Sequence, residues 1–484
     1  MRPTVRFLDD GLIRQIVAEA IDILSGLGVT IRNPEALSLL ADHGATVDMG
    51  RQHAMIPGDL VQRALQSAPH GFQLYDVLGR QTHDFRGDAV YFTPGSTALH
   101  VLDHASQKMR RATTKDYVDY AKVVSQLPHI ASQSTALIAA DVPAEISDSY
   151  RLFLSLLYGE KPVVTGAFSI DSFGVMRDLQ LAVRGTDEAL RDRPLTIFSC
   201  CPTSPLRWSD VTSQNLIDCS RQGIPVEFIA MPLSGFLAPV TLVGTLVQHT
   251  AETLSGLVIS QLVNPGAPIL YGGSPAIFDF RYETTPMGAM ETMMIDCAYN
   301  EIGKHLRLPT QAYISMSDAK QVDAQAGMES GMGAVLGVLS GINSISGPGM
   351  IDFESCLSLE KLVLDNEMCG MALRLVAGIK PKEDFPARPH FEELLRERHL
   401  LIADHTRRHW KTEISFPGPV IDRARRDRWE QEGSQSLPER AHRQVELLLE
   451  RYQPSRLADE AKRELVRRME HEARRYGLQR LPQR

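Results

Sequence analysis

An eightfold alternation of short apolar runs and helical stretches begins near residue 89 and limits the possible folds of this chain. Several runs are apolar on both faces, as parallel strands covered by helices require. Eight successive strand–helix units favour a closed (β/α)₈ barrel of the α/β class over an open doubly wound sheet, which is the alternative. The predicted strands span 89–94, 130–137, 162–168, 195–201, 226–231, 268–273, 310–316 and 342–347. The predicted helices lie near 114–126, 147–158, 171–184, 209–222, 240–262, 286–306, 322–340 and 357–378.

The residues before this repeat predict a different kind of structure. Residues 8–28 carry apolar side chains at helical spacing, and 35–43 and 57–66 predict two further helices. Two short β-rich runs on either side of Gly79 predict a β-hairpin. We therefore expect a helical and hairpin cap over residues 1–88.

The last hundred residues are rich in Arg and Glu with spaced leucines, and they predict helices near 419–430, 436–451 and 455–475. The chain has 484 residues, which leaves room for such a region beside a barrel of about 250 residues. We expect the barrel over 89–380 and a C-terminal helical extension over 381–484. The extension would pack on the barrel or on a neighbouring subunit, so a homo-oligomer is expected.

Composition excludes several classes of protein. A formal net charge of −8 argues against general nucleic-acid binding, which needs a concentrated basic surface. No apolar run reaches the length of a membrane span, and the N-terminus lacks the apolar core of a secretory signal. The six cysteines form no CxxC, and no His pair near them has zinc-finger spacing. We expect a cytoplasmic enzyme with reduced thiols, no membrane contact and no metal of its own.

In a (β/α)₈ barrel, functional residues lie where the strands end. Small residues gather at three of these ends, and glycine allows close backbone approach, so a bulky planar ligand could reach the barrel mouth. Simple tight turns are the alternative explanation. The predicted cofactor-binding residues are Thr93, Gly95, Gly272, Gly273, Gly347 and Gly349.

The predicted mouth is poor in acid–base groups. No GxSxG, HExxH or Walker motif is present, and no pair of strand-end carboxylates of the glycosidase kind. Such a site suits methyl transfer from a quaternary ammonium, because the amine leaves neutral and positioning supplies most of the acceleration. No catalytic residue is assigned.

Aromatic faces and a carboxylate would hold the cation of such a substrate. For the aromatic side chains the alternative is a core position, and Asp318 has the alternative of pairing with Lys320 or capping the next helix. The predicted substrate-binding residues are Phe92, Glu227, Tyr271, Phe278, Phe280, Tyr313 and Asp318.

Several long motifs resemble the trimethylamine methyltransferase family. They are FTPGSTALHVLD (92–103), SDAKQVDAQAGMESGMGAVLGVLSGINSISGPGM (317–350), LVLDNEMCGM (362–371) and FPGPVIDRARRDRWEQEGSQSLPERA (416–441). Together with the barrel pattern, the resemblance covers nearly the whole chain. Because the chain contains only ordinary residues, it is similar to the branch without pyrrolysine, which is glycine betaine methyltransferase-like.

The resemblance implies transfer of a methyl group from a small quaternary amine to the Co(I) of a corrinoid (cobalamin) carried by a separate partner protein. A betaine substrate would also need a partner for its carboxylate, which Arg281, His100 or backbone N–H groups could provide. Two alternatives remain open: a non-catalytic barrel that binds quaternary amines, and a diverged barrel hydrolase or lyase.

Overall fold

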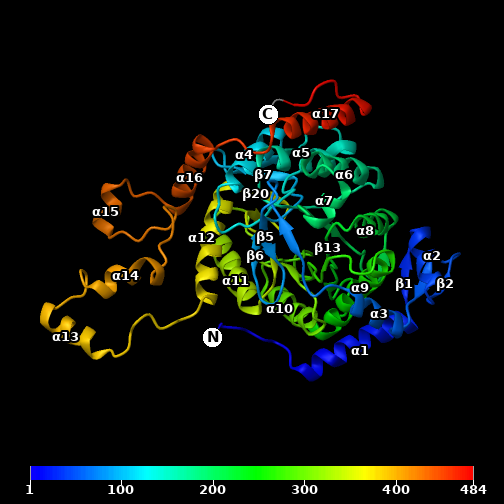
Figure 1. Ribbon diagram of the computed structural model, residues 1–484, viewed down its shortest axis with the longest axis horizontal. Coiled ribbons are helices and arrows are strands. Elements are labelled where there is room, and N and C mark those ends of the chain that lie inside the picture. The colour runs from blue at the N-terminus through cyan, green and yellow to red at the C-terminus, as the bar shows by residue number, and fades with distance from the viewer. Residues whose placement is uncertain (1, 483–484) are drawn as a thin grey trace.

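The computed structural model describes residues 2–482, and eight short parallel strands form its centre (Figure 1). Two hydrogen-bonded ladders contain them, one from β9 to β15 and one joining β17, β18 and β6. The strands are β6 (Tyr91–Thr93), β9 (Gln133–Ser134), β10 (Val163–Thr165), β11 (Thr196–Cys200), β13 (Val226–Phe228), β15 (Ile269–Leu270), β17 (Gln311–Tyr313) and β18 (Ser344–Ser346).

Backbone contacts join the two ladders at both seams. At one seam, Tyr271 and Thr310 form a parallel bridge between the chain segments of β15 and β17. At the other, the N–H of Ala131 donates to the carbonyl of Phe92 across 2.8 Å. The sheet therefore closes on itself, which confirms the predicted barrel and excludes the open sheet.

Helices surround the strands, and each of the eight predicted ones is present with its ends shifted by a few residues. Hydroxyl N-caps start several of them, as at Ser209, Thr241 and Ser358. A short helix, α7 (Asp187–Asp192), was not predicted. The eight are α4 (Thr114–Val124), α5 (Ser147–Tyr158), α6 (Ile170–Arg184), α8 (Asp210–Gln222), α9 (Leu242–Val263), α10 (Met290–His305), α11 (Ala324–Ser340) and α12 (Leu359–Val376).

The N-terminal region packs on one side of the barrel. Its helices α1 and α3 lie against α9, which explains why α9 is buried on nearly every side. Its small sheet extends to β12 (Arg207–Trp208), in the loop after β11. The elements are α1 (Asp10–Gly26), α2 (Pro34–Asp42), α3 (Gly58–Ser67), β1 (Val29–Ile31), β2 (Thr46–Asp48) and β3 (His53–Met55).

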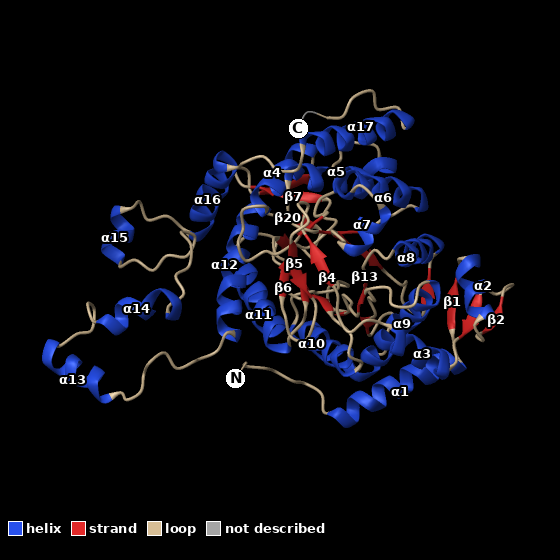
Figure 2. Cartoon of the chain, in the orientation of Figure 1, coloured by secondary structure: helices blue, strands red, loops and turns tan. Residues whose placement is uncertain are grey.

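The predicted hairpin is present as β4 (Gln73–Tyr75) and β5 (Gln81–Asp84), and it lies across the amino-terminal end of the barrel (Figure 2). Its apolar side chains form a separate cluster with interior side chains of the barrel strands, so the hairpin plugs this end. The cluster comprises Leu74, Phe85, Val164, Ile197 and Leu270.

Short strands in the loops at the other end of the barrel were not predicted. One sheet has the order β19–β20–β7–β8, and β14 pairs with β16. These strands are β7 (His100–Asp103), β8 (Lys108–Arg111), β14 (Leu233–Ser234), β16 (Ala276–Ile277), β19 (Met350–Ile351) and β20 (Cys356–Leu357).

The C-terminal region has two parts. Helices α13 (Arg388–Glu397), α14 (Asp404–Glu413) and α15 (Arg426–Gln431) contain no buried residue and extend away from the barrel (Figure 1). Helices α16 (Leu437–Arg451) and α17 (Asp459–Arg475) return to pack on barrel helices, α16 on α12 and α17 on α6. Within residues 2–482, no helix has both the length and the apolar character of a membrane span.

Candidate active site

A cavity of about 310 Å³ lies at the carboxyl ends of the barrel strands. Its lining is mostly small and polar, with two aromatic rings, Tyr313 and Phe168, and one guanidinium group, Arg151. A volume at the low end of the range for ligand pockets fits a molecule with few heavy atoms. The other lining residues include Ser96, Thr135, Thr165, Ser199 and Glu354.

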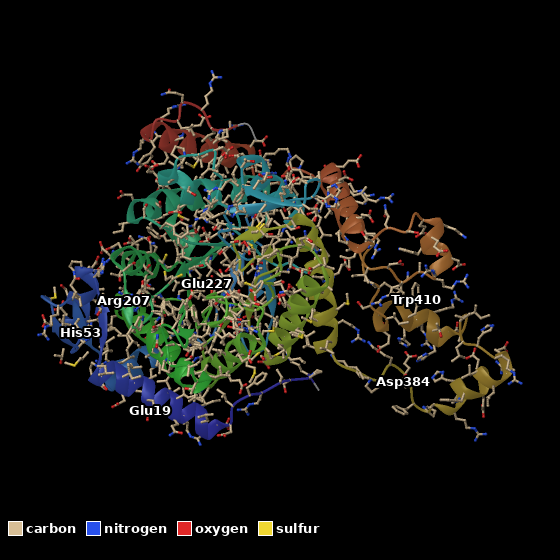
Figure 3. All side chains as sticks on the ribbon, turned by 180° about the vertical axis from the view of Figure 1, so that it is seen from behind. Glu19, His53, Arg207, Glu227, Asp384 and Trp410 are labelled. Atoms are coloured by element: carbon tan, nitrogen blue, oxygen red, sulfur yellow. The ribbon has the colours of Figure 1, made fainter. Side chains whose placement is uncertain are left out.

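Glu227 is fully buried within the barrel, on β13 (Figure 3). The hydroxyl of Ser199, which lines the cavity, donates to Oε1 of Glu227 across 2.7 Å. The other oxygen, Oε2, is buried and has no hydrogen-bond partner within the described residues. Desolvation raises the pKa of Glu227 to about 7, because burial penalises the charged form. The group is therefore poised between its neutral and ionised forms near pH 7.

Glu354 approaches the same cavity from the loop after β19, where its backbone has a left-handed φ of 69°. Its Oε1 accepts a 3.1 Å hydrogen bond from the N–H of Ser96. Desolvation, with a smaller contribution from the nearby charge of Glu227, raises the pKa of Glu354 to about 8. Two carboxyl groups of this kind disfavour each other's ionisation and would both be stabilised by a bound cation.

Tyr313 completes this group of three. Its side chain lies in the cavity wall, and its hydroxyl is 3.0 Å from Oγ of Ser96. Desolvation, followed by the charges of Glu354 and Glu227, raises the pKa of Tyr313 well above its usual value. The phenol therefore stays neutral, and its ring offers a π face to a cation.

Arg151, near the start of α5, supplies the positive charge in the cavity wall and is buried to 1 % exposure. Its Nη2 lies 3.0 Å from Oδ1 of Asp148, and its Nη1 donates to the carbonyl of Thr135 across 3.2 Å. Its guanidinium carbon lies 5.1 Å from the ring centroid of Phe168. These contacts hold the guanidinium group in one orientation at the cavity wall.

The predicted substrate-binding residues are not all near this cavity. Glu227 and Tyr313 lie together in the barrel, whereas Phe92 and Tyr271 occupy the alternate positions of their strands and pack toward the helices. The hydroxyl of Tyr271 donates to Thr250 of α9, and its ring packs against His249.

The remaining predicted side chains belong to the loops around the mouth. Phe278 stacks on Phe236, and Phe280 packs edge-on against Phe278 and is 65 % exposed. Both carboxylate oxygens of Asp318 accept backbone hydrogen bonds, from Met287 and Gly288. Desolvation raises the pKa of Asp318 to about 6. These three residues are outside the lining of the cavity.

The residues predicted to bind the cofactor are closely surrounded by protein atoms. A Cβ at Gly95 would lie 2.3 Å from Cγ of Met350, and one at Gly273 would lie 2.4 Å from Nε2 of His249. Gly272 and Gly347 are packed in the same way, Gly349 has a left-handed φ of 89°, and Thr93 is buried. Tight packing or a left-handed backbone therefore explains the glycines by itself, and their role toward a cofactor stays a prediction.

Two residues of the cavity, Glu354 and Arg151, were missed in the sequence. Arg151 could have been found, because it directly precedes the apolar run LFLSLL in a predicted buried helix, where an unpaired charge is costly. Glu354 left none, since it lies in a loop. The suggested carboxylate partner Arg281 is exposed and paired with Asp279 at 2.7 Å, and His100 is outside the cavity lining.

The family model described as trimethylamine methyltransferase matches residues 1–476. The chain belongs to the trimethylamine methyltransferase family. It is 32 % identical to a trimethylamine methyltransferase of Methanosarcina barkeri over 91 % of this chain and 90 % of that protein. It is 29 % identical to one of Desulfitobacterium hafniense, over 96 % and 93 %. A glycine betaine methyltransferase of that species is 26 % identical, over 95 % of each chain. The chain is therefore a methyltransferase.

A solved structure shares the fold at much lower sequence similarity. The monomethylamine methyltransferase of Methanosarcina barkeri matches with a TM-score of 0.51 and 10 % identity, over 98 % of this chain and 88 % of that one. The chain therefore shares its fold with a methyltransferase of known structure.

Proposed function

We propose that this methyltransferase takes a methyl group from a small quaternary amine and passes it to the Co(I) of a corrinoid on a separate protein. The observation that carries the proposal is that Glu354 and Tyr313 line one small cavity, while Glu227 is hydrogen-bonded to Ser199 of the cavity wall. Two carboxyl groups and an aromatic face suit a cation that cannot donate hydrogen bonds. Family membership supports the same reaction.

In this reaction the main contribution of the protein is to position the substrate. The N–CH₃ bond of the substrate breaks with its electron pair staying on nitrogen, which leaves a neutral tertiary amine. The acceptor Co(I) supplies the pair for the new bond to carbon. Since the leaving amine needs no proton, the reaction requires no general acid. Glu227, Glu354 and Tyr313 hold the ammonium group so that one methyl faces the cavity opening.

A betaine carboxylate would be met by Arg151. Three of its nitrogens already bond to Ser147, Thr135 and Asp148, which fixes the plane of the guanidinium group. Four of its five N–H groups have protein partners, since Nη1 also reaches Thr97, and one N–H on Nη2 is left for a ligand. We propose a substrate with an ammonium group at one end and a carboxylate at the other.

The reaction is tested by following methylcobalamin formation from free cob(I)alamin with glycine betaine, proline betaine, carnitine, choline and trimethylamine. Turnover with a quaternary amine is expected, and betaines should exceed choline. Turnover with trimethylamine alone would overturn the proposed substrate class. Saturable binding of a betaine without methyl transfer, even with the cognate corrinoid protein, would overturn the reaction.

We also propose a homo-oligomer. The C-terminal arm (residues 379–431) exposes a run of large apolar side chains, with Ile379 at 91 % and Phe385 at 79 % exposure. An apolar surface of this extent is rare on a monomer. A second copy of the chain is the partner that the arm fits best, since its helices have no buried face of their own.

A further inference from the structure

Outside the lining of the candidate active-site cavity, three metal-ligating side chains from distant parts of the sequence meet. They are His104 in the β7–β8 turn, Glu360 in the first turn of α12 and His442 on α16. Their ligand atoms all lie within 4.8 Å of one another. We propose that this cluster binds a zinc ion, which fastens the returning C-terminal helix α16 to the barrel.

The two imidazole rings lie side by side next to the carboxylate. They stack face to face with centroids 3.7 Å apart and an angle of 3° between their planes. Nδ1 of His442 lies 2.8 Å from Oε1 of Glu360, and Nδ1 of His104 lies 3.7 Å from the same oxygen. Both Nδ1 atoms therefore lie near the same carboxylate oxygen.

These separations fit zinc. Ligand atoms of a tetrahedral zinc ion, at about 2.0–2.1 Å from the metal, are roughly 3.4 Å apart. The two Nδ1–Oε1 distances lie on either side of that value. Because the rings are stacked and parallel, at least one imidazole would rotate out of the stack when the ion binds. Two imidazoles and one carboxylate form a zinc-binding set, and the ion would leave one position for water.

The surroundings hold the ligands in place. Oε2 of Glu360 accepts a 2.9 Å hydrogen bond from Ser358, which leaves Oε1 for the metal. Such an outer hydrogen bond orients a ligating carboxylate. On the other side, Nε2 of His442 lies 3.7 Å from Glu446, a carboxylate that would stabilise the imidazole of a metal-bound histidine.

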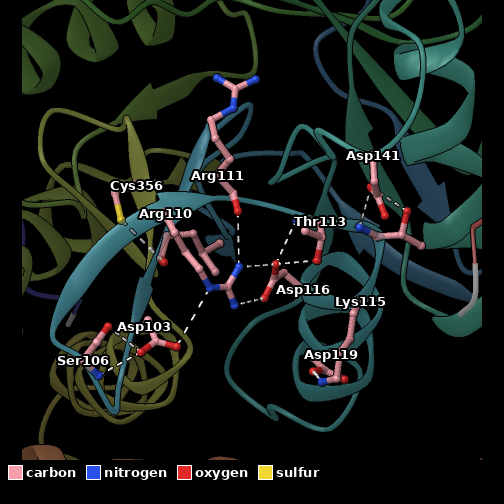
Figure 4. A network of polar contacts seen from close by, with 12 residues as sticks. Asp103, Ser106, Arg110, Arg111, Thr113, Lys115, Asp116, Asp119, Asp141 and Cys356 are labelled. Atoms are coloured by element: carbon pink, nitrogen blue, oxygen red, sulfur yellow. Dashed lines mark hydrogen bonds and ion pairs between the residues drawn. The ribbon is translucent and has the colours of Figure 1, made fainter.

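The turn that carries His104 is also fixed by its own polar contacts (Figure 4). Asp103 accepts hydrogen bonds from the N–H and the hydroxyl of Ser106, at 2.8 and 2.6 Å. Arg110 pairs with Asp116 through two 2.7 Å contacts, and Lys115 pairs with Asp119. Because these cations have carboxylate partners of their own, they do not compete with the histidines for Glu360.

An adjoining cavity of about 300 Å³ gives an ion access to the cluster from solvent. His104 and His442 both line it, with side chains 27 % and 35 % exposed, and Glu360 lies in its wall at 8 %. The chain spacing of the three residues resembles no known zinc motif, so the sequence had indicated no metal. Only the fold brings them together.

The test uses the full-length protein, stripped with a chelator and titrated with Zn²⁺ against a competing indicator of known affinity. One tight site is expected in the wild type, and His442→Ala, His104→Ala and Glu360→Gln should each weaken it by about tenfold or more. His43→Ala is the matched control, because His43 is exposed on the N-terminal region and its ring is hydrogen-bonded to the carbonyl of Leu39, far from the cluster in the sequence. It should leave the site unchanged.

A second measurement distinguishes loss of the metal site from misfolding of the variants. Co²⁺ in the wild type should give the intense visible absorption of a low-coordinate site, which His442→Ala should lose. Zinc should raise the Tm of the wild type and leave that of a His104→Ala/His442→Ala double variant unmoved. Equal zinc affinity in the double variant and the wild type, with both folded, would overturn the proposal.

Discussion

Ser199 donates a 2.7 Å hydrogen bond to one oxygen of Glu227, while the other oxygen of that carboxylate is buried without a partner among the described residues. A half-satisfied carboxyl group in a protein interior is costly. It is commonly found where a ligand supplies the missing interaction.

Substrate affinity should rise with pH. Burial raises the pKa of Glu227 to about 7 and that of Glu354 to about 8, and a bound cation favours their ionised forms. Binding therefore releases a proton below these values, and the Kd of a betaine should fall by up to about tenfold per pH unit between pH 6 and 8. Calorimetry at several pH values measures this, and a pH-independent Kd would contradict the role of both carboxyls.

Glu227→Gln should stabilise the fold at pH 8 while impairing activity. The pKa of this carboxyl is its usual 4.5 in the unfolded chain and about 7 in the folded one. Ionising the group inside the folded protein is therefore unfavourable, and the stability that its protonated form provides is lost as the pH rises through 7. Glutamine avoids this cost, worth about 3 kcal/mol, and its amide oxygen keeps the bond from Ser199. Urea unfolding should show the gain at pH 8 and little gain at pH 5. An equal difference at both values would exclude the ionisation cost as its cause.

Tyr313 and Tyr271 offer a matched pair of aromatic residues. Tyr313→Leu should raise KM about 10- to 30-fold, since a desolvated cation–π contact contributes about 2 kcal/mol. Tyr313→Phe keeps the ring and should change KM little. Tyr271→Phe, on the helix side of the barrel wall, should leave KM unchanged and lower stability by about 1 kcal/mol, through loss of its bond to Thr250. A larger KM effect at Tyr271 would place the cation elsewhere.

Arg151→Lys should change which substrates are preferred. Lysine keeps the charge but loses the fixed planar donors, so kcat/KM for betaines should fall about tenfold or more. The value for choline, which lacks a carboxylate, should change little, and this serves as the control for folding. Equal losses with both substrates would mean that Arg151 acts only through Asp148 and the local structure.

The C-terminal arm should carry the oligomer contact. A Leu395→Glu/Leu401→Glu double variant alters two side chains that are 67 % and 78 % exposed, so the barrel should fold normally. Its mass by light scattering should drop toward that of one chain. Leu27→Glu, at a 68 % exposed site beyond α1, is the control and should keep the wild-type mass. An unchanged mass in the double variant would remove the arm from the interface.

The sequence predicted the barrel strands and helices because each is a local pattern of apolar residues. The short strands β7, β8, β19 and β20 escaped prediction, since two to four residues carry little pattern and their partners are distant in the chain. Their pairing depends on how the loops around the mouth pack together, and no local sequence pattern indicates that packing.

Residues of the candidate site could be predicted from the sequence only where they belong to the barrel strands. Glu227 and Tyr313 are strand residues and were found, whereas Glu354 and Arg151 reach the cavity from a loop and a helix. Phe92 and Tyr271 show a second limit. A strand that is apolar on both faces does not reveal which face points inward.

The hairpin β4–β5 closes the interior of the barrel at its amino-terminal end, because Leu74 and Phe85 occupy that opening. Under the proposed reaction, the amine and the corrinoid protein must then use the same entrance. The enzyme would have to follow a compulsory order, in which the amine enters first and the demethylated product leaves only after the corrinoid protein has dissociated. Excess corrinoid protein should therefore inhibit turnover by trapping the enzyme before its amine has bound.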